Sequence, residues 1–166
     1  MKFKYYLNKS VKTTVQPENK YELKDIIEDT IKEQGFNCDL NFIDTSKITD
    51  MSALFSDSEF NGDISQWNVS NVETMRYMFY NSTFNGDISK WNVSHVKDMT
   101  SMFKGSKFNG DISKWNLSNV KGMDTMFTDS AFNGDISKWN VSNVEDMEYV
   151  FNRSPLEGNE PDWYKD

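Results

Sequence analysis

The chain has 166 residues, which suits a single domain, and its composition excludes several classes of function. Its 26 acidic against 18 basic residues give a net charge of −8, which argues against nucleic acid or an anionic membrane surface as the partner. One cysteine and one histidine exclude an internal disulfide, a CxxC metal or redox motif, and most histidine-based catalysis. No apolar run approaches the ~18 residues of a membrane span, and residues 1–9 lack the apolar core of a signal peptide, so we expect no membrane insertion.

The head of the chain predicts a small N-terminal cap. Apolar and aromatic residues alternate with others over 3–7 and 11–15, which predicts the two short strands of a hairpin. Asn19 has the chemistry of a helix N-cap, and apolar residues then recur at helical spacing until Gly35, a typical helix stop. We therefore predict a helix over about residues 20–34.

A repeat of 24 residues, FNGDISQWNVSNVETMRYMFYNST in its second copy, fills most of the remaining chain. Its five copies begin at equivalent phenylalanines: Phe36, Phe60, Phe84, Phe108 and Phe132. They divide the chain into an N-terminal cap over 1–35, five repeats over 36–155 and a C-terminal partial repeat over 156–166. Because one such repeat cannot bury enough apolar surface to fold alone, we expect the copies to stack.

The apolar positions within a repeat predict the shape of each coil. The spacing Ile64-x-x-Trp67-x-Val69 matches the leucine-rich signature, in which a short strand turns alternate side chains inward. From Val72 the apolar residues recur every three positions, which predicts a 3₁₀ or short α-helical turn. We therefore predict an α/β solenoid, a leucine-rich-repeat-like, right-handed stack of 24-residue coils that each hold a short parallel strand and a short helical turn.

Two ladders of equivalent residues each allow two interpretations. The tryptophans form either a platform for sugar rings or, as the inward alternation favours, a core spine whose indole N–H groups bind backbone carbonyls. The aspartates are either calcium ligands or caps for turn N–H groups, and the absence of a Gly-Gly pair and a second aspartate favours caps. This aspartate ladder consists of Asp39, Asp63, Asp87, Asp111 and Asp135.

Two residues depart from the repeat. Cys38 stands where the next copy has Gly62, so either this turn does not require a positive φ or the first coil is distorted. His95 stands where other copies have asparagine or lysine, which indicates an exposed position open to any polar residue. No Ser/His/Asp, Cys/His or isolated carboxylate pair breaks the periodicity, so we expect neither an enzyme nor a cofactor.

Two exposed surfaces are candidates for binding a protein. The preferred one is the set of outward strand positions, which are nearly constant along the array: Gln66, Asn68, Lys90, Asn92, Lys114, Asn116, Lys138 and Asn140. The helical side instead varies from copy to copy at two sets of positions: Ser52, Arg76, Thr100, Asp124 and Glu148, and Ala53, Tyr77, Ser101, Thr125 and Tyr149. Tyrosine and arginine on that side suit a specific protein partner.

The unit F-N-G-D-I-S-x-W-N-V-S-N-V-x-x-M-x-x-M-F resembles the repeat of the BspA-like leucine-rich-repeat surface proteins of bacteria. The resemblance extends over about residues 17–164, including the helical segment that opens the array. It implies a leucine-rich-like solenoid, a cell-surface or secreted location, and adhesion to partner proteins.

These features together predict a non-enzymatic, monomeric protein-interaction module, an adhesion-type bacterial surface protein that binds an unidentified protein through its outward strand face. A cytoplasmic scaffold or inhibitor built on the same solenoid is one alternative, because the chain shows no signal peptide. A calcium- or glycan-binding repeat protein is the other, because of the aspartate and tryptophan ladders.

Overall fold

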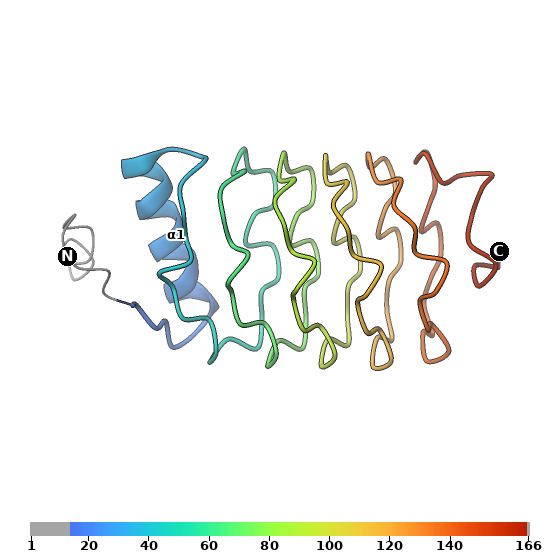
Figure 1. Ribbon diagram of the computed structural model, residues 1–166, viewed down its shortest axis with the longest axis horizontal. Helices are drawn as coiled ribbons and strands as arrows, with labels where there is room; N and C mark the ends of the chain where they lie inside the picture. The colour runs from blue at the N-terminus through green and yellow to red at the C-terminus, as the bar shows by residue number, and fades with distance from the viewer. Residues whose placement is uncertain (1–13, 166) are drawn as a thin grey trace.

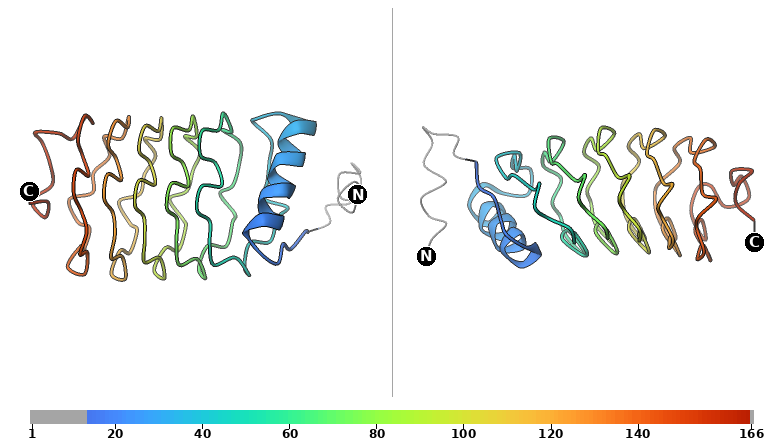
Figure 2. Two further views of the ribbon diagram at one scale, coloured as in Figure 1. Left: turned by 180° about the vertical axis from the view of Figure 1, so that it is seen from behind. Right: turned by 90° about the horizontal axis from the view of Figure 1, so that it is seen from below.

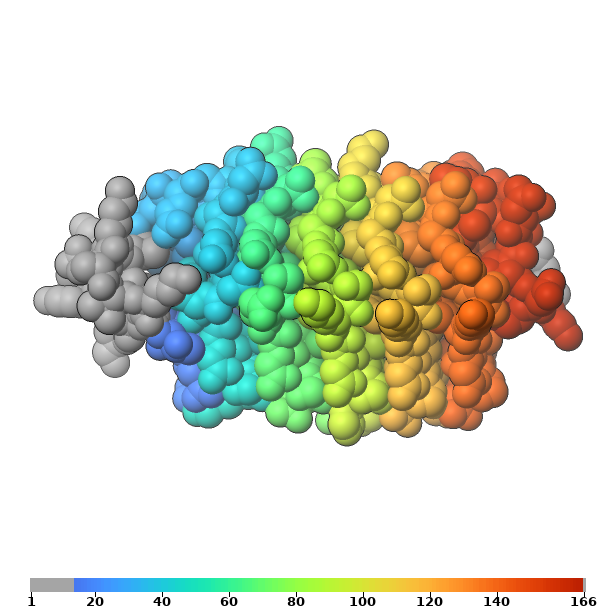
Figure 3. All heavy atoms as spheres, in the orientation of Figure 1, coloured from blue at the N-terminus to red at the C-terminus, as the bar shows by residue number. Residues whose placement is uncertain are grey.

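The computed structural model describes residues 14–165, which form a row of coils stacked along one axis (Figure 1). Helix α1, Lys20–Gln34, covers one end of the row, and the tail that follows the fifth repeat lies at the other end. Figures 2 and 3 show that repeats adjacent in the sequence are also neighbours in space. Within the described residues, no helix is long and apolar enough to cross a membrane.

Helix α1 lies over the segment where the sequence predicts a helix. Asn19 is extended at φ −158°, and its side-chain oxygen accepts hydrogen bonds from the N–H groups of Tyr21 and Glu22. Gly35 ends the helix with φ 87°, and its N–H donates to the carbonyl oxygen of Ile31. The side chains that α1 buries belong to the same apolar core as the coils: Leu23, Ile26 and Ile27, together with the polar Thr30.

The predicted hairpin lies almost wholly outside the described residues, which include only its last two positions. Val15, the second of these, forms a parallel bridge with Ile43 of the first coil. The Val15 N–H donates to the carbonyl oxygen of Phe42 at 3.0 Å, so the chain contacts the first coil before it enters α1.

The coils contain neither strands nor helices, so the predicted α/β solenoid is wrong. Within residues 14–165, α1 is the only helix, and parallel pairing is limited to isolated bridges such as that of Thr74 with Asp98. The segment predicted as a strand folds into tight turns, the first of which is closed by the Trp67 N–H donating to the Ile64 carbonyl at 3.1 Å. The segment predicted as a helical turn is a further series of such turns.

Polar side chains beside each apolar pair explain why the strand does not form. The Asp63 carboxylate accepts a hydrogen bond from the Ser65 N–H at 2.9 Å, and the Asn68 side chain accepts one from the Ser70 N–H at 3.1 Å. These local bonds occupy N–H groups that a strand would donate to its neighbour. A row of turns buries the same apolar side chains as a strand would, so apolar spacing alone does not distinguish the two.

Backbone hydrogen bonds between coils hold the stack together. Four alternate N–H groups of the second repeat donate to carbonyls of the third at 2.8–3.1 Å: Met75 to Asp98, Tyr77 to Thr100, Phe79 to Met102 and Asn81 to Lys104. The asparagine of each Asn-Gly pair adds a side-chain link, since the Asn85 N–H donates to Asn61 Oδ1 at 2.8 Å and the next two coils repeat this bond. Each coil is therefore stabilised by its neighbours.

Aromatic side chains fill the interior of the stack. The Phe79 ring lies 5.5 Å from the Phe103 ring with their planes 5° apart, and 4.5 Å from the Phe84 ring. The tryptophans of four repeats are only 3–4% exposed: Trp67, Trp91, Trp115 and Trp139. Each indole N–H donates to a carbonyl 27 residues earlier, as Trp91 does to Ile64 at 3.2 Å. The prediction of an inward tryptophan spine is confirmed, and buried rings of this kind cannot serve as a sugar platform.

Two positions in each coil adopt left-handed backbone angles. The first set has φ of 53–58° and no common residue type: Ala53, Tyr77, Ser101, Thr125 and Tyr149. The second has φ of 50–70° and is mostly Asp, Asn or Gly: Asp57, Asn81, Gly105, Asp129 and Arg153. Left-handed angles are unfavourable for side-chain-bearing residues and most of all for a β-branched one such as Thr125. In the first four repeats, the N–H groups of these residues donate hydrogen bonds to the next coil, which holds them in this conformation.

The glycines of the Asn-Gly pairs are required by close packing and not by a positive φ. Gly62 and its equivalents are absent from the described positive-φ glycines, which confirms that this turn does not need a left-handed residue. A Cβ atom on Gly62 would lie 1.9 Å from the carbonyl oxygen of Cys38 in the preceding coil. Cys38 belongs to the first coil and has no coil before it, which explains why a side chain is tolerated there.

We predict that Gly62→Ala destabilises the protein more than Gly134→Ala does, by about 2 kcal/mol. Both new methyl groups meet the phenylalanine ring two residues earlier, at 2.7 Å in each case. Only the methyl of Gly62→Ala also meets a backbone carbonyl, which cannot move without separating two coils. Urea unfolding of the two variants measures the difference, and equal losses would show that this carbonyl does not restrict the position.

A second asparagine ladder links the coils on their outer side. The Asn71 side-chain N–H donates to the carbonyl of Ser46 at 2.7 Å, and Asn119 and Asn143 make the same bond to the coil before. His95 occupies this position in the third repeat; it is exposed, as predicted, but makes no such bond. The position therefore favours asparagine and is not open equally to all polar residues.

We predict that His95→Asn stabilises the protein by about 1 kcal/mol, because the new side chain reaches the Ser70 carbonyl, which accepts no hydrogen bond within residues 14–165. The reciprocal change Asn119→His removes an existing bond and is expected to destabilise by a similar amount. Thermal and urea unfolding of both variants measure these effects. Two changes of the same sign would contradict a hydrogen-bonding role for this position.

Candidate interaction face

The candidate face consists of the side chains that the sequence predicts to point outward. All of them are exposed, and we call them the Lys–Asn face: Gln66, Asn68, Lys90, Asn92, Lys114, Asn116, Lys138 and Asn140. They project from turns, because the predicted sheet does not exist. Equivalent members are 24 residues apart in the sequence, so the second to fifth repeats present an asparagine each, beside Gln66 in the second repeat and a lysine in the other three.

The asparagines of the Lys–Asn face are held in fixed orientations. The side-chain oxygen of each accepts a hydrogen bond from the N–H of the serine two residues later, at 3.0–3.2 Å. This bond closes a turn and restricts the side chain before any partner arrives. The amide NH₂ groups are then left in a regular row for a partner's carbonyl or carboxylate oxygens.

The lysines of the Lys–Asn face lie beside the aspartate ladder. The pKa of the Asp87 carboxyl is lowered mainly by the hydrogen bond from the Ser89 N–H, and the nearby charge of Lys90 lowers it further. Lys114 and Lys138 make the same smaller contribution at Asp111 and Asp135. The lysines and the aspartates together form a mixed strip of both charges. Such a strip suits a partner that offers both charges.

The aspartate ladder closes turns, as the capping interpretation predicts. Each carboxylate accepts a hydrogen bond at 2.8–3.0 Å from the N–H two residues later: Asp39 from Asn41, Asp63 from Ser65, Asp87 from Ser89, Asp111 from Ser113 and Asp135 from Ser137. Within the described part of the chain, no cluster of three or more His, Cys, Asp or Glu residues is placed to hold a metal ion.

The repeat is characteristic of one protein family. The family described as "Mycoplasma protein of unknown function, DUF285" matches residues 5–107 and again residues 81–163. The chain belongs to the DUF285 family. No curated protein and no solved structure matches it. The two matched ranges overlap and together span α1 and all five repeats.

The variable side of this DUF285 array is less exposed than the sequence predicts. Ser101 is buried, with its hydroxyl 2.7 Å from that of Thr125 in the next coil. Tyr77 and Tyr149 are 37% and 63% exposed, so single tyrosines and not a continuous strip reach solvent. The Arg76 guanidinium lies over the Tyr77 ring, 5.6 Å from its centre. Both side chains therefore already interact within their own coil.

A hollow of about 650 Å³ lies on another side of the DUF285 array, near its N-terminal end. Its charged side chains pair with each other, since Lys47 contacts Glu18 at 2.6 Å and Lys97 contacts Glu73 at 2.8 Å. His95 is also in its lining. Because these charges are already paired, the hollow offers little to a charged ligand.

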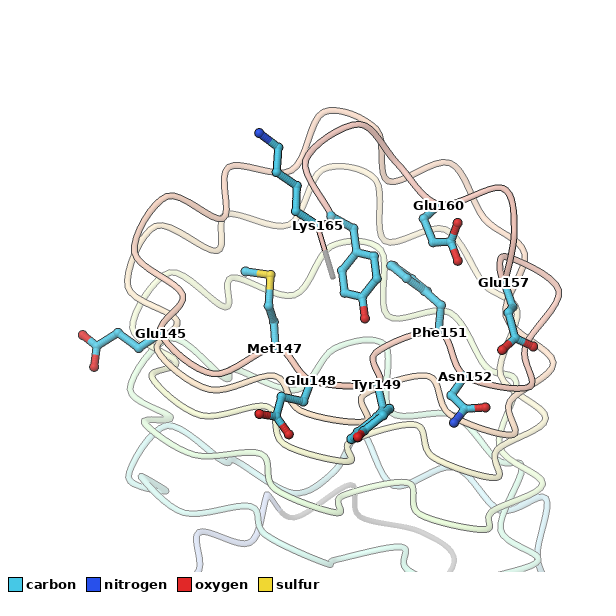
Figure 4. Close-up of a pocket in the computed structure, with 10 residues that line it drawn as sticks. Glu145, Met147, Glu148, Tyr149, Phe151, Asn152, Glu157, Glu160 and Lys165 are labelled. Atoms are coloured by element: carbon cyan, nitrogen blue, oxygen red, sulfur yellow. The ribbon is translucent and has the colours of Figure 1, made fainter.

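A second pocket, of about 620 Å³, lies at the C-terminal end of the array (Figure 4). Met147, Tyr149 and Phe151 of the last coil line one part of it, and Glu157 and Glu160 of the tail line another. The tail contacts this coil closely, and the Tyr164 ring packs edge-on against Phe151 at 5.1 Å. Sequence reasoning missed this pocket, because it lies between the fifth repeat and the tail, whose packing the repeat pattern does not predict.

We predict that the DUF285 array loses stability in acid partly through its aspartate turns. Hydrogen bonds from the serine N–H groups lower the pKa of four carboxyls: Asp63, Asp87, Asp111 and Asp135. A lowered folded pKa gives stability that is complete above the unfolded value, about 3.9, and that disappears as the pH falls through the folded value.

The measurement is the free energy of unfolding between about pH 2 and pH 5. Changing the four aspartates together to asparagine keeps the turn acceptors but removes their titration, so the slope against pH should decrease. Asp25→Asn on α1 is the control, because this exposed carboxylate makes no turn bond. An unchanged slope in the fourfold variant would contradict the assignment.

Proposed function

We propose that this DUF285 chain is a non-enzymatic protein-interaction module that binds a partner protein through the Lys–Asn face. The observation that carries the proposal is the repetition, in the second to fifth repeats, of an exposed asparagine that a turn hydrogen bond holds in one orientation. A partner that contacts several coils gains from each of them at once, so weak individual contacts add up to useful affinity.

The chemistry of the face supports a protein as the partner. Side-chain amides in a row bind backbone carbonyls or carboxylates, and the adjacent lysines and aspartates add contacts of both charges. With a net charge of −8, the chain is not suited to the phosphate backbone of nucleic acid. The periodicity of the coils also leaves no unique, asymmetric group of side chains of the kind that an enzyme needs.

We further propose that the module acts at a bacterial cell surface, in adhesion. Support comes from the resemblance of its repeat to that of BspA-like surface proteins and from its membership of a Mycoplasma repeat family. Antibody labelling of intact cells, compared with permeabilised cells, tests the location. Labelling only after permeabilisation would favour the cytoplasmic scaffold instead.

The binding face is tested by a triple charge reversal, Lys90→Glu, Lys114→Glu and Lys138→Glu. The immobilised chain is used to capture proteins from surface and cytosolic fractions, and the affinity for each captured protein is then measured. We expect the triple variant to bind at least about tenfold more weakly, because three contacts become repulsive. Unchanged affinity would exclude the Lys–Asn face as the site.

A matched control carries the same change of charge elsewhere: Lys24→Glu, Lys104→Glu and Lys107→Glu. Its binding should equal that of the unmodified chain. The melting midpoints of both triple variants are compared, since reversal beside Asp87 and its equivalents can weaken the turns. A third variant with glutamine at the three face positions separates loss of attraction from added repulsion and should show an intermediate affinity.

A further inference from the structure

Four asparagine–glycine pairs lie at the start of the second to fifth repeats, each within the same hexapeptide, Phe-Asn-Gly-Asp-Ile-Ser. They are Asn61-Gly62, Asn85-Gly86, Asn109-Gly110 and Asn133-Gly134. In such a pair the glycine nitrogen can attack the carbonyl carbon of the asparagine side chain, because glycine has no side chain of its own to hinder the approach. Whether this reaction occurs in a folded chain depends on what restrains the two groups.

The reaction is a deamidation that needs only water and base. The glycine nitrogen loses its proton to the base and forms a bond to the side-chain carbon of the asparagine, which closes a succinimide ring. The side-chain nitrogen takes up a proton and leaves as ammonia. Water then opens the ring on either side. The products are aspartate and isoaspartate, an isomer whose main chain runs through the former side chain.

The reacting groups are accessible in all four pairs. The four asparagines are exposed, so water and base reach their side chains. None of the four glycine N–H groups donates a hydrogen bond within residues 14–165, so no acceptor holds the attacking nitrogen in place. Differences between the pairs must therefore come from the asparagine side chains and from the packing around the glycines.

Three of the asparagine side chains are restrained by the coil that follows. Each side-chain oxygen accepts a hydrogen bond at 2.8 Å from the N–H of the next asparagine in the ladder: Asn61 from Asn85, Asn85 from Asn109, and Asn109 from Asn133. The side chain must rotate to bring its carbon to the glycine nitrogen, and rotation breaks this bond. Reaction at these three residues therefore carries the cost of a hydrogen bond.

The side chain of Asn133 has no such restraint. Its oxygen accepts no hydrogen bond within residues 14–165, although its own N–H donates to Asn109. The residue 24 positions later is Glu157, but the Glu157 N–H donates to the Ser154 carbonyl at 3.1 Å, because the chain turns there and no longer follows the repeat. The asparagine ladder therefore stops at Asn133, although its hexapeptide is identical to the other three.

Packing around the glycines adds to this difference. A Cβ atom on Gly62 would lie 1.9 Å from a carbonyl oxygen of the preceding coil, and one on Gly86 or Gly110 would lie 3.3 or 3.6 Å from such an oxygen. At Gly134 the three nearest atoms all belong to the Phe132 ring, two residues earlier. The preceding coil therefore restricts Gly134 least when its nitrogen moves toward the asparagine side chain.

We propose that Asn133 is a site of spontaneous deamidation in the folded chain, and that the asparagine ladder protects its three equivalents from the same reaction. Either product adds a negative charge to the fifth repeat, and isoaspartate also adds a methylene to the main chain, two residues before Asp135. In an earlier repeat that methylene would disturb the 24-residue register on which the neighbouring coils depend. The ladder thus confines the change to the fifth repeat, and this inference is independent of the Lys–Asn face.

Mass spectrometry of each pair tests the proposal. Trypsin cleaves after lysine and arginine, so a digest separates the four asparagines into peptides 48–76, 77–90, 108–114 and 122–138. The folded chain is incubated at mildly alkaline pH, which favours loss of the glycine proton. Asn133 should react at least about fivefold faster than any of the other three. Equal rates, a faster reaction at another pair, or no reaction at Asn133 would overturn the proposal.

The unfolded chain provides a control with the same covalent structure. In concentrated urea the four pairs should react at equal rates, because their hexapeptides are identical and no ladder forms. The difference between Asn133 and the other three asparagines should therefore disappear on unfolding. If Asn133 reacted faster by the same factor in urea, the folded ladder would not be what protects the other three.

Two alanine variants test the attacking group. Gly134→Ala places a methyl group beside the attacking nitrogen and should slow the reaction at Asn133 to the rate of the other three or below. Gly110→Ala is the matched control, because its methyl meets the phenylalanine two residues earlier at 2.9 Å, against 2.7 Å for Gly134→Ala. It should leave Asn133 the fastest site. An unchanged rate at Asn133 in Gly134→Ala would contradict attack by the Gly134 nitrogen.

The products distinguish the two routes by which an asparagine can lose its amide. A succinimide opens to both aspartate and isoaspartate, so a methyltransferase specific for isoaspartate should label peptide 122–138 of the incubated chain. Direct hydrolysis of the side chain by water would give aspartate alone. Aspartate without isoaspartate in this peptide would therefore overturn the proposed reaction.

Discussion

The constraint on which the whole structure depends is the 24-residue register of the backbone hydrogen bonds between coils. Each coil must place a backbone carbonyl opposite each N–H group that the preceding coil directs toward it. The Asp98 carbonyl, which accepts from the Met75 N–H, is an example. This requirement explains the absence of insertions, the closeness that excludes a side chain at Gly62, and the left-handed angles accepted at residues such as Thr125. An array of this kind derives its stability from interfaces and not from any coil alone.

The repeat, the core and the helix could be predicted from the sequence, but the local backbone could not. Periodicity shows which side chains are buried, and Trp67 and its equivalents are buried as expected. It does not show whether a strand or a row of turns buries them, and the side-chain bonds of Asp63 and Asn68 decide for turns. Asp, Asn and Gly are the residue types that most often adopt left-handed angles, so those angles at Asp57, Asn81 and Gly105 could have been predicted. The residue types of Tyr77 and its equivalents give no such indication.

The sequence reveals only part of the Lys–Asn face. Its residues can be predicted, because they occupy exposed positions that recur with the repeat. Its mixture of charges cannot, because it depends on how close the lysines lie to Asp87 and its equivalents in three dimensions.

The direction of the coil-to-coil hydrogen bonds has a mechanical consequence. These bonds run along the long axis of the molecule, so a pulling force applied between its two ends separates coils and does not slide them past each other (Figure 1). The interfaces are then loaded in series, and the weakest opens first. Each 24-residue coil that opens releases about 80 Å of slack, at ~3.4 Å per residue. The array can therefore act as an extensible tether that yields in steps.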